Sequence, residues 1–284
     1  MKKNILLITT ALMLCSAHAV AQNDGDDFGG ELSVEVEKKI KPGLSVEAGI
    51  SFRSQDDSKD MERFMASIDL SYRLFQTRDK KFNIKSSIGF DYILKQNLKE
   101  TSKKYDDFAY DESGALIGSK EDYYKGYNVE ERFKRNRYRG NLAFSFNYKP
   151  SKRWNFSLKE TFQYNHYASA DSINRYKYRL NDDDELSPTP KTIDKKYIAS
   201  KDRWILRNKF TVEYNIKGLP LNPFASVDFG VGLSKSTFKQ KYTAGLDFNI
   251  NKQNRLTTWY RFSHEDDDDE PNGHLVGLSY KFEF

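Results

Sequence analysis

The feature that most restricts what this chain can fold into is a repeated alternation of apolar and polar residues. In residues 44–52, for example, every second side chain is apolar, and the residues between them are polar or glycine. Successive side chains of a β-strand point to opposite faces, so this pattern predicts a strand with one apolar face. Eleven such segments lie near residues 31–40, 44–53, 63–74, 82–94, 138–148, 154–164, 204–216, 223–232, 238–250, 255–264 and 276–284.

The connections between these segments are of two kinds, which alternate along the chain. The short turns lie near residues 41–43, 76–81, 150–153, 217–222 and 251–254. The longer polar loops lie near residues 54–61, 97–134, 167–201 and 265–272, with a brief one near 233–236. All 7 prolines fall in a connection or at a strand start, as a hydrogen-bonded sheet requires. Short turns at one end and long loops at the other are typical of bacterial outer-membrane barrels, whose long loops are extracellular.

The beginning of the chain has the organisation of a secretory signal peptide. Two lysines near the start precede an apolar core at residues 5–14, and Ala19-Val20-Ala21 fits the rule for cleavage after a small residue. We therefore expect a signal peptide at residues 1–21, cleaved after Ala21, and a barrel domain at residues 22–284. The barrel domain would carry long extracellular loops near 97–134 and 167–201.

The end of the chain carries an alternating aromatic pattern, Tyr280-x-Phe282-x-Phe284. This ending resembles the C-terminal signal that the assembly machinery of bacterial outer-membrane barrels recognises. With the signal peptide, the alternation and the two kinds of loop, it predicts an all-β fold. That fold is a transmembrane, antiparallel, up-and-down β-barrel of about 10–12 strands. The alternative is a secreted soluble β-protein, which would need a second layer to cover its apolar faces.

The number of strands is ambiguous, because eleven segments alternate and antiparallel closure requires an even number. We expect twelve strands, with residues 22–30 forming an additional strand before 31–40. The alternative is a wall of ten strands with the first segment outside it.

Composition excludes several classes of protein. The mean hydropathy of the 284 residues is −0.79, and no run of about 18 apolar residues follows the signal, which excludes a helical membrane protein. The single cysteine, Cys15, lies in the signal, so the mature chain has no disulfide and no cysteine-based zinc site. Removing the signal with its two lysines leaves 44 basic against 41 acidic residues, a balance too even for a nucleic-acid partner.

The polar residues between the apolar ones are predicted to face the lumen of the barrel, and basic residues outnumber acids among them. Rings of Arg and Lys favour anions, so a narrow channel for small, anionic solutes is one interpretation. The alternative is a lumen filled by its own ion pairs, as in other small barrels. The principal basic candidates are Arg53, Arg137, Arg139, Arg203, Arg207 and Arg261, with lysines that include Lys159 and Lys209.

Two histidines flank an acidic run at one predicted loop. His264 and His274 lie on either side of residues 265–270, and a hairpin would bring them to the same strand end. Together with Asp266 and Asp268 they form a candidate site for zinc or a similar ion. The acids alone could hold Ca²⁺ or bridge it to lipopolysaccharide phosphates. The alternative is a solvated acidic loop, and no other cofactor is predicted.

Two polar residues, Glu160 and Asn208, interrupt the apolar face near the middle of neighbouring strands. A carboxylate that faces lipid is costly, so we expect a bulge to turn Glu160 inward. A contact with Asn208 or with another copy of the chain is the alternative. The tyrosine-rich loop at 97–134 could bind sugars or fold into the barrel mouth, and an ordinary exposed loop is the simpler interpretation.

Several short stretches carry a resemblance to a known family. They are Asp27-Phe28-Gly29, Val36–Ile40, Arg53, Asn136–Arg139, and Glu160 with Phe162 and Tyr164. They resemble an uncharacterised family of Bacteroidota outer-membrane proteins, the domain of unknown function numbered 2490. The resemblance spans nearly the whole mature chain. It implies an outer-membrane barrel and implies no activity.

The predicted function is therefore that of an outer-membrane barrel, either structural or a narrow pore. An enzyme that acts on lipid or peptide at the extracellular rim is a less favoured alternative, because no catalytic triad can be recognised from spacing alone. An adhesion or ligand-binding barrel is a second alternative. The expected partners are outer-membrane lipid and lipopolysaccharide, with periplasmic chaperones and the barrel-assembly machinery during biogenesis.

Overall fold

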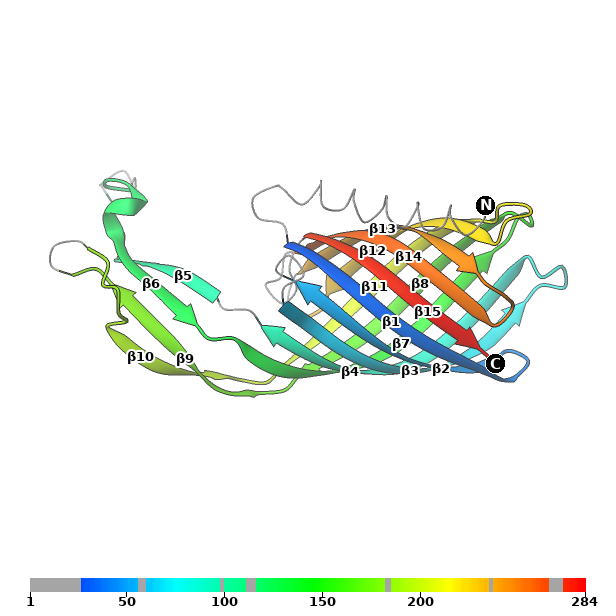
Figure 1. Ribbon diagram of the computed structural model, residues 1–284, viewed down its shortest axis with the longest axis horizontal. Helices are drawn as coiled ribbons and strands as arrows, with labels where there is room; N and C mark the ends of the chain where they lie inside the picture. Colours follow the sequence, from blue (N-terminus) through cyan, green and yellow to red (C-terminus); the bar gives the residue numbers. More distant parts are fainter. Residues whose placement is uncertain are drawn as a thin grey trace. The chain divides into compact units, whose positions relative to one another are not determined.

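The computed structural model describes residues 27–55, 60–97, 100–110, 116–181, 185–234, 237–265 and 273–284. These residues form two compact units, which are a barrel and a separate small sheet (Figure 1). The barrel unit comprises the described residues up to Lys95, together with Arg137–Tyr167 and Lys201–Phe284. The sheet unit comprises Gln96–Asn136 and Ala168–Ser200.

The barrel is a closed sheet of eleven strands in the order β1-β15-β14-β13-β12-β11-β8-β7-β4-β3-β2. The prediction of an all-β barrel is confirmed. The strands are β1 (Asp27–Lys41), β2 (Leu44–Gln55), β3 (Asp60–Gln76), β4 (Phe82–Asn97), β7 (Phe133–Tyr148), β8 (Trp154–Tyr167), β11 (Lys201–Tyr214), β12 (Leu221–Gly232), β13 (Phe238–Asn249), β14 (Asn254–Glu265) and β15 (Gly273–Glu283).

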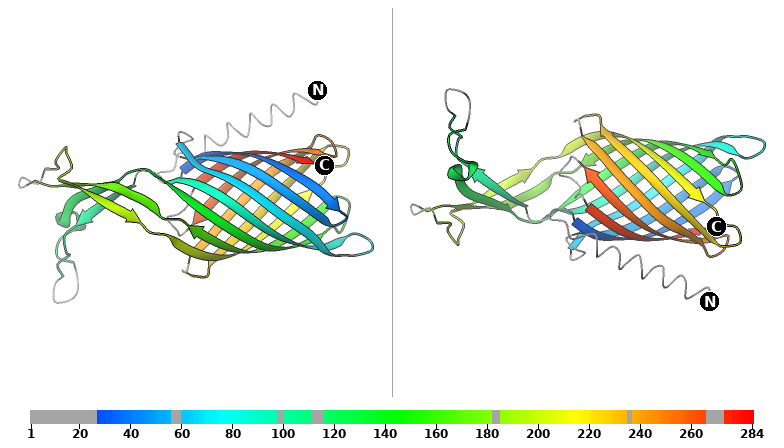
Figure 2. Two further views of the ribbon diagram at one scale, coloured as in Figure 1. Left: turned by 90° about the horizontal axis from the view of Figure 1, so that it is seen from below. Right: turned by 90° about the horizontal axis from the view of Figure 1, so that it is seen from above.

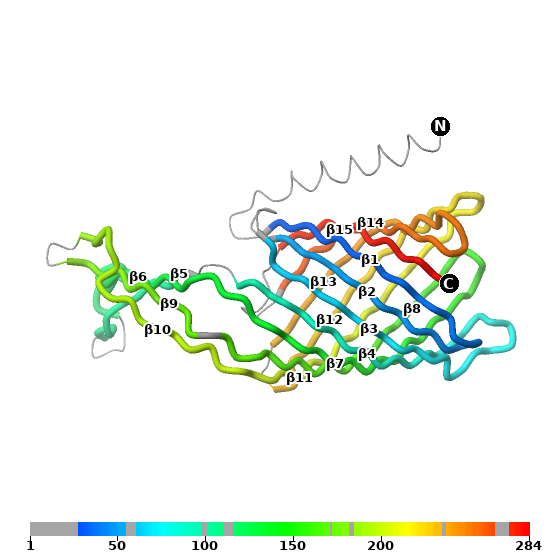
Figure 3. Tube along the Cα trace, turned by 60° about the horizontal axis from the view of Figure 1, so that its bottom comes forward, coloured from blue at the N-terminus to red at the C-terminus, as the bar shows by residue number. Residues whose placement is uncertain are grey.

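The barrel closes through a parallel pair between its first and last strands, which lie side by side in Figures 1 and 3. The register runs from Asp27 beside Gly273 to Glu37 beside Glu283. The expectation of twelve strands is wrong, because residues 27–30 are the beginning of β1 and not a strand of their own. An even number is required only when all neighbouring strands are antiparallel, and the parallel pair of β1 and β15 allows eleven strands to close.

Along each strand, alternate side chains point out of the barrel and into it, as the sequence predicts. Large apolar side chains lie exposed on the outer face, with Leu32 60% and Ile88 61% exposed. Ionic and amide side chains are buried inside, with Arg137 2% and Asn165 1% exposed. Figure 2 shows the tilted strands of the wall from opposite sides. This distribution is the reverse of the one in a water-soluble protein.

The short connections lie together at one end of the barrel. Pro42 and Gly43 join β1 to β2, and Gly43 has φ +89°, a left-handed conformation that a side chain would strain. At the opposite end, the chain leaves β4 and β8 for the two long excursions. The predicted separation of short turns from long loops is therefore present in the fold.

The two excursions form a four-stranded antiparallel sheet in the order β10-β9-β6-β5. The alternation predicts only loops near 97–134 and 167–201, whereas the structure forms four strands there. These strands are shorter than those of the barrel, so their alternation is harder to recognise. The elements are β5 (Glu100–Tyr105), the 3₁₀ helix η1 (Lys120–Tyr123), β6 (Tyr124–Glu130), β9 (Ala170–Arg179) and β10 (Thr192–Ile198). Across the ranges that the structure describes, no helix is long and apolar enough to cross a membrane.

Candidate functional site in the barrel lumen

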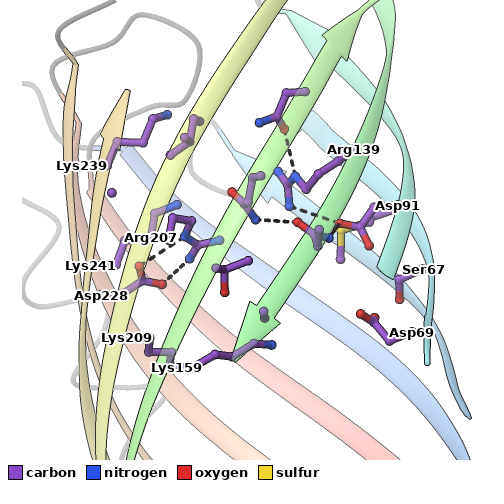
Figure 4. A pocket seen from close by; sticks show the side chains of 18 of the residues that line it. Ser67, Asp69, Asp91, Arg139, Lys159, Arg207, Lys209, Asp228, Lys239 and Lys241 are labelled. Carbon is purple, nitrogen blue, oxygen red and sulfur yellow. Dashed lines mark hydrogen bonds and ion pairs between the residues drawn. The ribbon is translucent and has the colours of Figure 1, made fainter. Parts of the chain in front are cut away.

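The inward-facing side chains surround a cavity of about 400 Å³ (Figure 4). Ten of the described residues that line it are cationic and six are acidic, so the lining carries a surplus of positive charge. The cationic residues are Arg53, Arg63, Arg137, Arg139, Lys159, Arg207, Lys209, Lys239, Lys241 and Arg261. The acidic residues are Glu31, Glu35, Glu47, Asp69, Asp91 and Asp228.

Five of the six arginines predicted from the sequence lie in this lining, and Arg203 lies elsewhere. Arg203 contacts the ring of Tyr167, with 5.7 Å between the guanidinium carbon and the ring centroid. The same ring also has Lys201 at 4.9 Å and Arg137 at 5.3 Å. Tyr167 is buried, and its ring attracts these three cations through cation–π interactions, which are stronger where the groups are desolvated.

On one side of the lumen, arginines from β2 and β3 share a carboxylate of β1. Arg53 Nη2 and Arg63 Nη2 lie 2.7 and 3.3 Å from Glu31 Oε2. Glu62, which is almost completely buried, lies 3.7 Å from Arg53 Nε. A register shift after Arg53 accompanies this approach. This cluster is neutralised internally and leaves little free charge for a solute.

Further along the wall, an amide network fixes one arginine of β7. Arg139 Nε donates to Asn165 Oδ1 at 3.0 Å, and its Nη1 lies 3.5 Å from Asp91 Oδ2. Asn141 Nδ2 donates to the same Asp91 oxygen at 3.0 Å, and Asn141 Oδ1 accepts from Gln163 Nε2 at 2.9 Å. These hydrogen bonds hold Arg139 against the wall (Figure 4).

The wall formed by β11 and β12 contains an arginine–carboxylate pair. Arg207 donates through Nε to Asp228 Oδ1 at 3.2 Å and through Nη2 to Asp228 Oδ2, so it engages both carboxylate oxygens. The inward position of Asp228 is absent from the sequence prediction. It could have been found, because Val227, Phe229 and Val231 occupy the outward positions on either side of it.

An aromatic residue narrows the lumen beside the cavity. Trp259 of β14 is buried inside the barrel, and the Arg261 guanidinium lies 4.2 Å from its ring centroid. Gly277 of β15 stands directly opposite Trp259, and a side chain there would overlap the indole. Glycine at 277 therefore makes room for a tryptophan that is absent from the sequence prediction. Alternation could have found it, because Trp259 lies two residues before the inward-facing Arg261.

The candidate metal site is only partly within the described residues. His264 and His274 extend the same face of β14 and β15, as their registers predicted. His274 is buried against Tyr260 and Phe262, and its Nδ1 lies 2.6 Å from the Tyr260 hydroxyl. Asp266 and Asp268 lie outside the described residues. Among the residues that are described, no three His, Cys, Asp or Glu side chains gather as metal ligands.

The two polar residues of the outer face are not hidden by a bulge. The registers of β7 with β8 and of β8 with β11 continue past Glu160 without a shift, so the expected inward turn is wrong. Glu160 remains exposed and stands directly opposite Asn208 on β11 and Phe144 on β7. Glu160 therefore lies beside Asn208, as the alternative interpretation predicts.

The C-terminal aromatic residues lie at the barrel end that carries the short turns. Phe282 and Phe284 stack with 5.7 Å between ring centroids, and Tyr280 donates to the Asn254 side chain. The Phe284 amide donates to the Glu37 carbonyl at 2.9 Å, which secures the last residue to β1. The predicted recognition signal is therefore also part of the closure of the barrel.

Comparison with known proteins identifies a family and no activity. The model of a family described as protein of unknown function (DUF2490) matches residues 32–273. This range contains most of the barrel and all of the small sheet, and it confirms the family predicted from the sequence. No curated protein matches the chain.

Proposed function

Because this chain belongs to the DUF2490 family, whose description assigns no activity, we propose its function from the barrel itself. The protein is an exported outer-membrane β-barrel whose lumen forms a narrow pathway for small, preferentially anionic solutes. Its partners are outer-membrane lipid and lipopolysaccharide, and chaperones and the assembly machinery deliver it there. The observation that carries the proposal is the inverted distribution of side chains, with apolar groups outside and ionic groups inside.

The outer face has the layout that a bilayer requires. On β8, Trp154 lies at the short-turn end and Tyr164 lies ten residues further on, about the length with which a tilted strand crosses a bilayer core, roughly 9–11 residues. Trp154 contacts Tyr214 at 4.8 Å, and Tyr164 contacts Trp204 at 4.6 Å, so aromatic rings bound both ends of the band. Aromatic girdles of this kind flank the lipid-facing band of outer-membrane barrels.

The surplus of cations in the lumen supports a preference for anions. With ten cationic and six acidic residues around the cavity, an anion entering the lumen is attracted and a cation is repelled. The effect is strong because the low-dielectric barrel wall focuses the field of these charges into the lumen. Several of the lumen cations are paired with carboxylates. The preference of the pathway for anions is therefore set by the cations that remain in excess.

The test is a measurement of current and reversal potential with refolded protein in a planar bilayer under a KCl gradient. We expect conductance with a preference for chloride. Replacing Arg137, Arg139 and Arg207 with Gln should shift the reversal potential toward cation preference. The matched control replaces Arg78, Lys80 and Lys81 with Gln, which removes the same charge from an exposed turn and should leave selectivity close to that of the wild type.

Three results would contradict the proposal. Preference for potassium in the wild type would refute the anion pathway. Absence of conductance from protein that shows the heat-dependent gel mobility of a folded barrel would refute a pore and favour a structural barrel. Recovery of the protein wholly from the soluble periplasm would refute the membrane location.

A further inference from the structure

Within the lumen, two lysines stand directly opposite each other on neighbouring strands. Lys159 of β8 and Lys209 of β11 are register partners, and both line the cavity (Figure 4). Among the described residues, neither ammonium group forms a hydrogen bond or an ion pair. Like charges directly across a β-ladder are destabilising, so this arrangement costs free energy unless a counter-charge lies between the two lysines.

The nearest carboxylate in the register does not relieve this repulsion. Asp228 is the β12 partner of Lys209, but both of its oxygens are engaged by Arg207. The same carboxylate is also the register partner of Lys241. One acid is therefore surrounded by three cations, and this wall retains a net positive charge.

The other side of the cavity presents the opposite charge. Glu35 of β1 and Asp69 of β3 both line the cavity, and in the described chain neither carboxylate forms a hydrogen bond or an ion pair. Asp69 occupies the space above Gly89, which a side chain at 89 would fill, and Glu35 packs over Gly49. Directly across the ladder from Asp69 is a further acid, Glu47. Two glycines thus make room for the two unpaired acids.

The order of strands places these charges on different sides of the lumen. In the barrel, β1 is five strands from β8 in one direction and five strands from β11 in the other. Glu35 therefore stands across the barrel from the lysine pair. Asp69 lies on β3, which is two strands from β1 and three strands from β8. Figure 4 shows Asp69 on one wall of the cavity and the two lysines on another.

We propose that the lumen binds a small zwitterion of the size of a short peptide. Its anionic group lies between Lys159 and Lys209, and its ammonium group lies toward Asp69 and Glu35. The inference rests on the proposed solute pathway, because it requires that water and solutes enter the lumen. It adds a defined binding site and a ligand class to that pathway.

A zwitterion fits better than a simple ion of either sign. An anion would neutralise the lysine pair but would leave both carboxylates unpaired in a confined space, where an uncompensated charge is costly. A cation would leave the lysines opposed. A molecule that carries both charges satisfies both walls at once. A cavity of about 400 Å³ lies within the range of small-molecule sites, about 300–1,000 Å³.

The test uses three probes that share the glycylglycine backbone and differ in which of its ends carries a charge. These are glycylglycine, which carries both charges, N-acetylglycylglycine, which keeps the carboxylate, and glycylglycinamide, which keeps the ammonium. Binding is measured by titration calorimetry with full-length mature protein refolded in detergent and confirmed as folded by its heat-dependent gel mobility. We expect glycylglycine to bind at least about tenfold more tightly than either blocked form, since one lost charge pair is worth this much or more.

Two double variants assign the ends of the ligand. Lys159→Gln with Lys209→Gln should weaken glycylglycine about tenfold or more and leave glycylglycinamide unchanged. Asp69→Asn with Glu35→Gln should reduce glycylglycine to the affinity of N-acetylglycylglycine. The matched control, Lys80→Gln with Lys81→Gln in the exposed turn after β3, should bind all three probes as the wild type does.

Three outcomes would overturn the inference. Equal affinity for glycylglycine and N-acetylglycylglycine would show a plain anion site. Equal affinity for all three probes would show no recognition of charge, and no binding by folded protein would show no site. The chloride-selective current is measured without any of these probes, so failure of the zwitterion site does not refute the proposed solute pathway. Conversely, a folded barrel that binds glycylglycine but does not conduct refutes only the pathway.

Discussion

The barrel and the small sheet are built from the same alternating pattern, yet they solve the problem of sheet edges in different ways. In the barrel, each of the eleven strands has a neighbour on both sides. The small sheet ends in two edges, at β5 and β10. Unpaired edge strands are sites of unwanted pairing, and closure is the only arrangement that removes them completely. The comparison shows that alternation specifies strands but does not specify closure.

The two regions also differ in strand length and in where charge lies. Strands of the barrel have 11–17 residues, whereas those of the sheet have 6–10. The barrel places its charges inside, but one face of the sheet carries an ion network in which Glu130 pairs with Lys196 at 2.7 Å and Arg175 at 2.9 Å. The two regions therefore differ in where their charged side chains lie, inside the wall of the barrel and across one face of the sheet.

Removing one strand from each region should give the largest difference between them. Deletion of residues 273–284 removes β15 and leaves β1 and β14 with open edges, so we expect no folded barrel. Deletion of Thr192–Ile198 removes β10, and the sheet then ends at β9, so we expect the barrel to persist. Heat-dependent gel mobility after refolding measures both. A barrel that survives loss of β15, or is lost with β10, would contradict the contrast.

Replacing a single glycine of the barrel should have the next largest effect on stability, because the strands of a closed sheet have little freedom to move apart and relieve a steric clash. Gly277→Val places a side chain into the Trp259 indole, and overpacking of this kind costs about 1–3 kcal/mol. We expect a lower urea midpoint for the refolded protein in lipid vesicles. The second variant Trp259→Ala in the same chain should restore much of the loss.

Gly140→Val is the matched control, because a side chain at 140 would meet no atom within 4 Å. Its urea midpoint should stay near that of the wild type. Equal destabilisation by the two valines would show that Trp259 is not the cause. Failure of Trp259→Ala to rescue Gly277→Val would lead to the same conclusion.

A smaller, opposite effect is expected on the outer face. Glu160→Leu removes a carboxylate from the middle of the apolar band, so unfolding from lipid vesicles should cost about 1–2 kcal/mol more than in the wild type. Lys195→Leu, at an exposed position of the small sheet, should leave that free energy unchanged. Destabilisation by Glu160→Leu would indicate that Glu160 binds a polar partner, such as a second copy of the chain.

The smallest effect concerns the response of the sheet to acid. Burial raises the pKa of Glu130, but hydrogen bonds and charge from Lys196 and Arg175 outweigh burial and hold that pKa below its usual 4.5. A lowered pKa means that the carboxylate stabilises the fold above pH 4.5 and that this stabilisation is lost as pH falls through the lowered pKa.

Amide hydrogen exchange of β6, β9 and β10, corrected for intrinsic rates, measures this response. Protection should fall in the wild type as the pH decreases below 4.5 and through the lowered pKa of Glu130. In Glu130→Gln, protection should be lower at neutral pH and change less with acid. Glu121→Gln in η1 serves as the control. Identical pH profiles for Glu130→Gln and the wild type would exclude Glu130 as the acid-sensitive group.

The lining of the lumen could largely be predicted, because alternation determines on which face of the wall a residue lies. Alternation predicts that Arg53, Arg139 and Arg207 face inward, and all three line the cavity. Their partners could not be predicted. The pairing of Arg207 with Asp228 depends on the register between strands, which alternation along one strand does not contain. For the same reason, no pattern in the sequence shows that Gly277 stands opposite Trp259.

The strand number shows a different limit. The number of alternating segments equals the eleven strands of the barrel, and only the assumption that all neighbours are antiparallel requires a twelfth. Direction is a property of pairs of strands, so the local pattern contains no information about a parallel pair. The small sheet was missed because its short strands, such as β5 and β6, offer too few alternating positions to stand out from a polar loop.

The parallel pair also imposes an order on folding. Most neighbouring strands of the barrel follow each other in the chain, but Asp27 pairs beside Gly273, so this contact joins the two ends of the described barrel. It cannot form until the last strand has been made, although closing so long a loop costs only slightly more entropy than closing a shorter one. Parallel ladders are also slightly weaker per residue than antiparallel ones. We therefore expect β1 and β15 to be the last strands to pair when the barrel folds and the first to separate when it opens.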